Sequence, residues 1–207
     1  MRTWLAAWFV AGLVCLPAVA EEQGGAAAPA KVAAPGAASE LDQLILTGQQ
    51  ALRTQRWKDA AGAFEKAIKL APGNGMVRFG LATACIQLRD YAQASRVLDA
   101  MLVEFPDNPE VKNNLAWICL KSDDPKIHDL PKAKRLAQDA VLQSSTDQNI
   151  WNTLAEVHYA QGDFGQALRA ARIAMQFALD AGDPNVLEYQ DLVARAAKKA
   201  GVSSGNP

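Results

Sequence analysis

The feature that most restricts the fold of this sequence is the recurrence of small residues at a period of 34 positions. One series has steps of 34, 34 and 39 positions and comprises Gly48, Ala82, Ala116 and Ala155. A second series has steps of 34, 39 and 34 positions and comprises Ala60, Ala94, Ala133 and Ala167. Pro72 and Pro106 are separated by the same period. A fixed period of this length predicts an array of stacked units, each of which buries its apolar face against its neighbours.

The repeating unit is clearest in residues 151–174, which read WNTLAEVHYAQGDFGQALRAARIA. Trp151, Leu154 and Ala155 have the spacing of one helical face. The run Gln161-Gly162-Asp163 predicts a turn. One face of the following helix is then formed by Phe164, Ala167, Ala171 and Ala174. Because alanine favours helix and small side chains let two helices touch, the unit is predicted to be a helix–turn–helix hairpin.

This unit resembles the tetratricopeptide repeat, whose pattern opens W-x2-L-G-x2-Y and repeats with the same period. Ala155 stands in place of the glycine, and Tyr159 comes one position late. The resemblance runs from Leu41 to about Leu179. It implies an all-α, right-handed α-α superhelix, a tetratricopeptide solenoid, of four helix–turn–helix repeats at 41–74, 75–108, 109–147 and 148–182.

A capping helix is expected at 183–201, because a repeat array needs a terminal element with one polar face. Asp183 and Pro184 have the residue types of an N-cap and a first helical position. The apolar face of this helix is predicted to comprise Val186, Tyr189, Val193 and Ala197.

The third repeat contains five extra residues, which lie within the segment 121–131. Ser122, Asp123, Asp124 and Pro125 are turn formers, and Pro131 suits the first turn of the next helix. Two interpretations stay open: a lengthened turn inside one repeat, or a loop that contacts a partner.

The N-terminus has the pattern of a secretory signal peptide, predicted at residues 1–20. Arg2 precedes an apolar run from Leu5 to Leu16, and Ala18-Val19-Ala20 provides a cleavage site after Ala20. We therefore expect a periplasmic or secreted protein; the alternative is an uncleaved membrane anchor. Lipid attachment at Cys15 is not favoured, because Val14 and Gly12 depart from the lipoprotein pattern. Residues 21–40, rich in Ala, Gly and Pro, predict a disordered linker, and 202–207 a disordered tail.

The composition argues against several kinds of partner. The formal net charge is −1, and no cluster of Lys and Arg marks a nucleic-acid or lipid-binding surface. Neither a phosphate-binding G-x-x-x-x-G-K-[ST] loop nor an H-E-x-x-H motif occurs in the sequence. We expect no nucleic-acid partner, no cofactor, no small-molecule substrate and no enzymatic activity. A membrane is involved only if the N-terminal segment stays uncleaved.

The residues that could carry chemistry are few. Of the two histidines, His158 is predicted to pack in the core, whereas His128 lies in the irregular segment near three aspartates, Asp123, Asp124 and Asp129. A weak metal site at His128 is an alternative to solvated turn residues. Cys85 and Cys119 are one period apart and are predicted to be small core residues, with a disulfide as the alternative.

In proteins with this repeat, the first helix of each pair lines a concave groove. Carried over by register, the groove residues are Ile45, Gln49, Met76, Phe79, Thr83, Asn113, Asn114, Trp117, Asn152, Glu156 and Tyr159. We predict that the Trp and Tyr rings are exposed and, with the asparagine amides, suit an extended or helical peptide. The carboxylate clamp of chaperone adaptors is not expected, because its places carry Ile45, Gln49, Gly80 and Glu110, and only Asn114 fits.

These observations predict a non-catalytic adaptor or scaffold of the cell envelope that binds a protein or peptide partner. The alternatives are a membrane-tethered assembly factor for an envelope complex, a metal-binding or enzymatic protein that uses His128, and a homo-oligomer formed through an exposed helix face.

Overall fold

The computed structural model describes residues 39–202, and every regular element in that range is a helix. The helices are α1 (Glu40–Arg53), α2 (Trp57–Leu70), α3 (Gly75–Gln87), α4 (Tyr91–Glu104), α5 (Pro109–Lys121), α6 (Leu130–Gln143), α7 (Gln148–Ala160), α8 (Phe164–Asp180) and α9 (Val186–Ala200). The predicted signal peptide at 1–20, the predicted linker up to residue 38 and the predicted tail from residue 203 lie outside the described residues. The linker was expected to end at 40, but Ser39 and Glu40 already open α1.

Helix starts are encoded locally and recur with the repeat. Ser39 and Asp42 form a capping box at the start of α1. The side chains of Asn74 and Asn108, one period apart, accept hydrogen bonds from the backbone N–H groups of Val77 and Val111 at the starts of α3 and α5. The repeated caps fix where each first helix begins, and thus the register of the residues along it.

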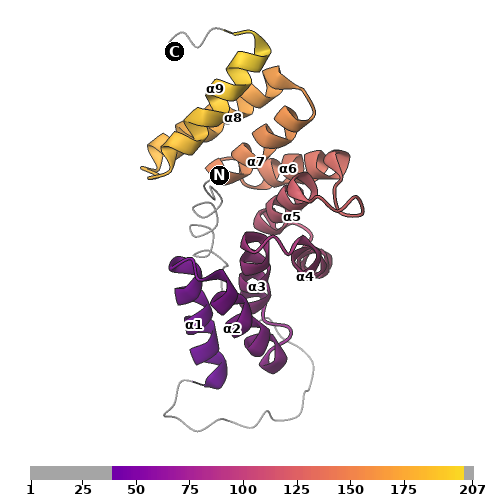
Figure 1. Ribbon diagram of the computed structural model, residues 1–207, viewed down its shortest axis with the longest axis vertical. Coiled ribbons are helices and arrows are strands. Elements are labelled where there is room, and N and C mark those ends of the chain that lie inside the picture. The colour runs from indigo at the N-terminus through magenta and orange to yellow at the C-terminus, as the bar shows by residue number, and fades with distance from the viewer. Residues whose placement is uncertain (1–38, 203–207) are drawn as a thin grey trace.

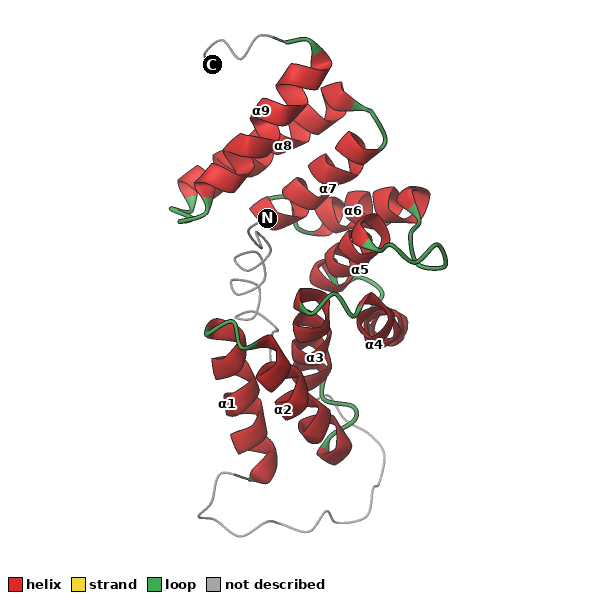
Figure 2. Cartoon of the chain, in the orientation of Figure 1, coloured by secondary structure: helices red, strands yellow, loops and turns green. Residues whose placement is uncertain are grey.

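The helices follow one another along an arc that runs from α1 to α9, with α4 on the outer side (Figure 1). Figure 2 shows the described elements as helices joined by short turns. Each helix packs against its neighbours in sequence, so that consecutive helices form antiparallel hairpins. First helices also contact one another, α1 with α3 and α5 with α7, and α9 covers α8 and part of α7. This is an all-α solenoid of stacked helical hairpins, as the repeat period predicts.

A single aromatic ring shapes the packing of the first two repeats. The side chain of Phe64 on α2 is 0 % exposed and lies between α1 and α3. A Cβ at Gly48 would lie 2.7 Å from the Phe64 Cζ atom, and one at Gly80 only 2.5 Å from it. The next repeat has Leu98 in place of Phe64 and Ala82 in place of Gly48. The contact around Phe64 therefore lacks even a Cβ on two helices, which leaves room for the larger ring.

The extra residues of the third repeat form the connection between α5 and α6, as predicted. The backbone N–H of Asp129 donates to the carbonyl of Cys119 at 3.1 Å, and Ile127 packs against the core. Asp123 forms an ion pair of 3.5 Å with Arg89 of the preceding repeat. The segment is thus a lengthened turn that is attached to the solenoid by its own contacts.

The last helix starts later than expected. Asp183 and Pro184 do not open α9; they precede it in a turn where the Asp183 carboxylate accepts the backbone N–H of Asn185 at 2.8 Å. The buried face of α9 comprises Tyr189, Leu192, Ala196 and Ala197, whereas Val186 and Val193 are only partly buried. The face is rotated from the predicted one, because α9 contacts both α8 and α7.

Candidate functional site: the inner face of the solenoid

The predicted groove residues lie on the first helices, but the prediction that Trp117 is exposed is wrong. Its exposed fraction is 6 %, and five further groove residues are also buried: Phe79, Thr83, Asn113, Asn114 and Asn152. Met76 is exposed, and partial exposure is found for Ile45, Gln49, Glu156 and Tyr159. The repeat pattern did not predict this burial, because α3 and α5 are buried on every face, from Val77 to Ile86 and from Val111 to Leu120. Positions that flank the packing residues are therefore covered as well.

Three buried asparagines on α5 and α7 hold polar atoms that are not hydrogen-bonded within residues 39–202. These atoms are the amide oxygens of Asn113 and Asn152 and the amide nitrogen of Asn114. Asn113 and Asn152 occupy equivalent positions of the third and fourth repeats. A buried polar atom without a partner costs about 1–3 kcal/mol. Each of these atoms is inaccessible to solvent, so a partner group reaches it only if neighbouring side chains move.

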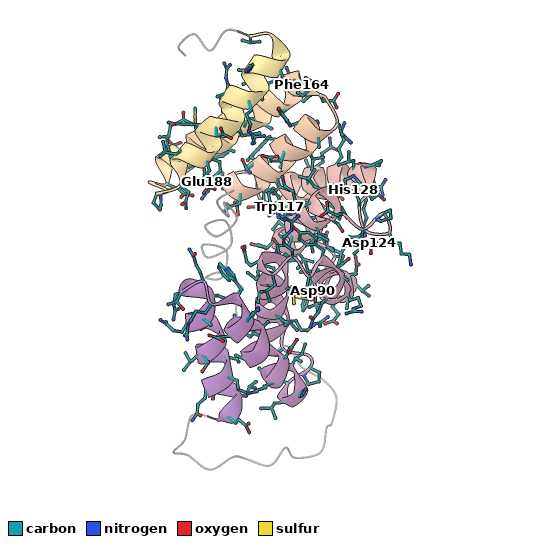
Figure 3. All side chains as sticks on the ribbon, in the orientation of Figure 1. Asp90, Trp117, Asp124, His128, Phe164 and Glu188 are labelled. Carbon is teal, nitrogen blue, oxygen red and sulfur yellow. The ribbon has the colours of Figure 1, made fainter. Side chains whose placement is uncertain are left out.

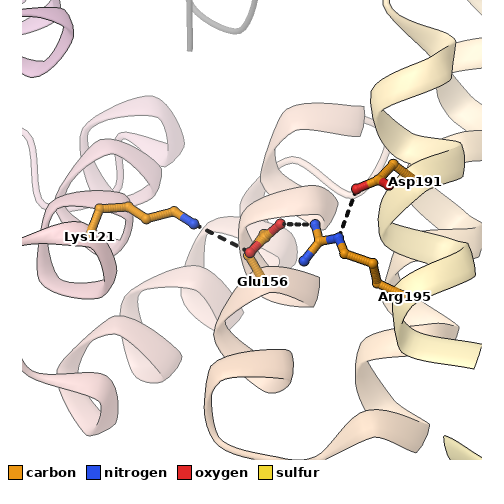
Figure 4. Close-up of polar contacts among 4 residues, drawn as sticks. All are labelled: Lys121, Glu156, Asp191 and Arg195. Carbon is orange, nitrogen blue, oxygen red and sulfur yellow. Dashed lines mark hydrogen bonds and ion pairs between the residues drawn. The ribbon is translucent and has the colours of Figure 1, made fainter. Parts of the chain in front are cut away.

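Next to these amides lies a group of charged residues that we call the inner ionic cluster: Lys121 of α5, Glu156 of α7, and Asp191 and Arg195 of α9. The Glu156 carboxylate accepts a hydrogen bond of 2.7 Å from the Arg195 guanidinium and lies 3.3 Å from the Lys121 ammonium. Arg195 also donates to Asp191 at 2.8 Å. Figure 4 shows the chain of contacts from Lys121 through Glu156 to Arg195 and Asp191. The cluster joins three helices across the inner face.

The charges of the cluster balance, and two rings flank it. The Glu156 side chain is 16 % exposed, which makes it the least accessible member. Burial lowers the pKa of Arg195, but hydrogen bonds and charges from Glu156 and Asp191 outweigh burial and raise it overall. The Lys121 ammonium lies 4.6 Å from the centre of the Trp117 ring, and the Arg195 guanidinium lies 5.2 Å from that of Tyr159. Both rings are therefore engaged by cations of the same protein.

The structure thus brings together Trp117, Glu156 and Tyr159 from the predicted set, and adds Lys121 and Arg195, which the sequence reasoning missed. Lys121 is four residues after Trp117, so helical spacing places the two on one face. The predicted apolar face of the last helix did not include Arg195. No local pattern in α9 pairs it with Glu156, which lies two helices earlier in the chain.

The residues of the metal alternative lie elsewhere. Figure 3 places Asp124 and His128 on the protruding connection between α5 and α6, away from Trp117. The Asp124 and Asp129 side chains accept backbone N–H groups of Lys126 and Lys132, as turn and cap residues do. Within the described part of the chain, no three His, Cys, Asp or Glu residues gather closely enough to hold a metal ion.

His158 and the two cysteines lie in the core. His158 is 7 % exposed; burial, with help from the charge of Lys134, lowers its pKa, against the effect of Asp163. Cys85 and Cys119 are buried and free. Burial raises the pKa of Cys85 to about 12 and also raises that of Cys119, so both remain thiols at neutral pH. These groups have the properties of core residues.

Within residues 39–202, no helix is long and apolar enough to cross a membrane.

Comparison with known proteins supports the fold. Residues 51–118 match the family model described as tetratricopeptide repeat. The comparison with curated proteins found no match. Among solved structures, a MamA protein superposes with a TM-score of 0.59 at 15 % identity, covering 79 % of this chain and 84 % of that one. A thermophilic TPR protein of Thermus thermophilus gives 0.60 at 16 % identity, covering 78 % and 92 %. MamA from Desulfovibrio magneticus gives 0.58 at 16 % identity, covering 79 % and 92 %.

The superpositions show a shared fold, and at such low identity they carry no information on a shared partner. With the nine helices and the repeat period, they show that residues 39–202 form an all-α tetratricopeptide solenoid, of which residues 51–118 match the family model itself.

Proposed function

We propose that this protein is a non-catalytic scaffold of the cell envelope that binds a peptide segment of a partner protein on its inner face. Tetratricopeptide solenoids present extended concave surfaces to protein partners. Export rests on the sequence before the described residues, where Arg2, the apolar run 5–16 and Ala18-Val19-Ala20 have the order of a signal peptide. The proposal does not require a cofactor or a catalytic group.

The observation that carries the proposal is that one amide atom each of Asn113, Asn114 and Asn152 lacks a hydrogen-bond partner among the described residues. These atoms are covered, so the proposal includes a movement of neighbouring side chains that uncovers them when the peptide binds. A peptide backbone offers one N–H donor and one C=O acceptor at each residue, so it can pair with amide oxygens and with an amide nitrogen alike. Pairing with the backbone depends little on the side chains of the peptide. Specificity would then come from the rings and charges beside the amides, namely Trp117, Tyr159 and the inner ionic cluster.

The test uses the double variant Asn113→Leu with Asn152→Leu. Leucine resembles asparagine in shape, although it is larger, and it removes the buried amides. Removing the buried amides favours the variant and the larger leucines oppose it, so we expect its free energy of unfolding to stay within about 2 kcal/mol of the wild type, while peptide binding falls by about tenfold or more. Peptides would be selected from a displayed library of envelope protein segments on the wild type, and their affinities measured for both proteins by fluorescence anisotropy.

A matched control is Gln138→Leu, an exposed position on α6, one of the second helices. It should change neither stability nor affinity by more than a few tenths of a kcal/mol. Equal affinity of wild type and double variant for every selected peptide would exclude the inner amides as the binding site. A double variant that is destabilised by much more than the cost of the larger side chains would show that the asparagines serve the fold instead.

A further inference from the structure

Charge is distributed unevenly across the width of the solenoid. Because consecutive helices are antiparallel, the ends of the second helices and the starts of the first helices meet at one edge, and the remaining halves meet at the other. Dividing each helix at its middle assigns 40–46, 64–81, 98–115, 137–154 and 172–193 to the first edge. The second edge then comprises 47–63, 82–97, 116–136, 155–171 and 194–202.

The two edges have nearly opposite net charges. The first edge contains 13 Asp and Glu against five Lys and Arg, a net charge of −8, and we call it the acidic edge. The second contains 14 Lys and Arg against seven Asp and Glu, a net charge of +7, and we call it the basic edge. The protein's overall charge of −1 hides this separation. Four of the five segments of each edge have the sign of that edge; the exceptions are 64–81 on the acidic edge and 155–171 on the basic edge. The potentials therefore add along most of the array.

The acidic edge also holds most of the exposed apolar surface. Eight of the ten exposed large apolar residues of the described range lie there: Leu46, Leu70, Met76, Val103, Phe105, Leu142, Leu179 and Leu187. Val103 and Leu142 hold equivalent positions of α4 and α6 and are 83 % and 84 % exposed. Exposed apolar side chains at equivalent positions of successive repeats favour an interface along this edge.

We propose that the acidic edge of one molecule binds the basic edge of a second copy of the same protein. Both charge signs are present on one chain in nearly equal amount, and a second copy is the partner that satisfies both edges at once. The aliphatic stems of Lys and Arg on the basic edge can cover the leucines and valines of the acidic edge while their charged ends meet its carboxylates. An anionic lipid surface or a nucleic acid would engage the basic edge alone and leave the acidic, apolar edge exposed.

An interface between two different surfaces of the same protein repeats in one direction. Unless the rotation between copies closes a ring, it produces an open chain of molecules. The charges counted for the two edges include those of the inner ionic cluster, but the six substitutions that test the contact lie outside that cluster and outside the inner amides. The inference is independent of the peptide site and does not require it.

The test pairs two charge variants of the protein expressed from its full sequence. The acidic-edge variant carries Asp107→Lys, Asp139→Lys and Asp180→Lys, which changes that edge from −8 to −2. The basic-edge variant carries Lys58→Glu, Lys126→Glu and Lys198→Glu, which changes that edge from +7 to +1. All six side chains are exposed. Circular dichroism and thermal melting confirm that each variant is folded; if one is not, Asp→Asn and Lys→Gln at the same sites replace it.

Sedimentation velocity gives the masses in solution. We expect the wild type to associate increasingly with concentration at about 50 mM salt, and at least tenfold more weakly at about 500 mM, where charges are screened over a few ångströms. Each variant alone should remain a monomer. An equimolar mixture should form dimers that contain one copy of each variant. The native basic edge of one variant binds the native acidic edge of the other. The dimers should not grow further, because the two edges left free are both altered.

Three results would overturn the inference: a wild type that stays monomeric at low salt, an association that salt leaves unchanged, or a mixture that behaves as its separate variants do. Association of the wild type that survives both sets of substitutions would move the interface away from the two edges. If instead the basic-edge variant alone loses binding to vesicles of anionic phospholipid that the wild type binds, and the wild type remains monomeric, the basic edge is a membrane surface.

Discussion

Replacing Gly80 by alanine is the sharpest test of the packing in the first two repeats. In an ordinary helix this substitution stabilises by about 0.8–1.0 kcal/mol, because glycine is a poor helix former. Here the new Cβ would lie 2.5 Å from the Cζ atom of Phe64, closer than real Cβ atoms come to a neighbour. The ring is 0 % exposed, so it cannot move into solvent.

The balance of the two effects predicts a loss of stability. Forcing extra volume into a packed core costs about 1–3 kcal/mol, and a contact as short as this one lies toward the upper end of that range. After the helix propensity is subtracted, we expect Gly80→Ala to reduce the free energy of unfolding by about 1–2 kcal/mol. For a chain of this size that lowers Tm by about 2–8 °C. Gly62→Ala on α2 is the matched control, because no atom lies within 4 Å of its Cβ position. It should raise Tm.

The assay is urea and thermal unfolding followed by circular dichroism, for both single variants and for Gly80→Ala combined with Phe64→Leu. If the ring is the cause, the double variant should show a coupling of about 1 kcal/mol or more, since the smaller leucine relieves the contact. A rise in Tm for Gly80→Ala similar to that of Gly62→Ala would refute the reasoning, as would strict additivity of the two substitutions.

Three further predictions follow from contacts in the described chain. Burial lowers the pKa of His158 from its ordinary 6.5, so the unfolded chain binds the proton first and stability should fall as pH drops below about 6.5. The variant His158→Gln should therefore make the urea midpoint less dependent on pH between pH 7 and 5, roughly the window of an ordinary histidine. The same effect from His128→Gln would contradict this assignment. Glu156→Ala should lower the free energy of unfolding by about 1–2 kcal/mol and speed amide hydrogen exchange in α9, because Lys121 and Arg195 lose the carboxylate that they share. Unchanged exchange in α9 would show that the cluster does not hold that helix. Glu104→Ala removes the carboxylate that contacts the Arg78 guanidinium at 2.7 and 2.8 Å. Because the Arg78 side chain is only 8 % exposed, the variant should lose about 1–3 kcal/mol of stability, seen as a lower urea midpoint with an unchanged m-value.

The fold could be predicted because its determinants are local or periodic. Small residues at the helix contacts, such as Ala82 and Ala116, must recur wherever the same hairpin recurs. The caps Asn74 and Asn108 act on backbone groups only three residues away. Such interactions survive in the sequence as spacing, which is why the position of the five-residue insertion could be read from two series of small residues alone.

The inner face could be predicted only as a list of positions, without their environments. Register placed Asn113, Asn152 and Trp117 on the first helices, but it treated each helix as half exposed. Whether a flanking residue is covered depends on the neighbouring repeats, and these approach through the superhelical packing of the whole array. The burial of Trp117 is a property of that packing, not of its own repeat.

The sequence by itself therefore determined the architecture: the helical hairpins, their number, the cap that follows them and the elongated third turn. It also contained the opposite charges of the two edges, which become visible only once the helices are known to alternate in direction. The tertiary structure alone decided the contacts between residues distant in the chain. It brought Lys121 and Arg195 to the two oxygens of Glu156, and it left no room for a Cβ at Gly48 or Gly80. The reason is physical: helix formation and capping act over three or four residues, whereas a charge or a ring contacts its distant partner only once the neighbouring repeats have packed against it.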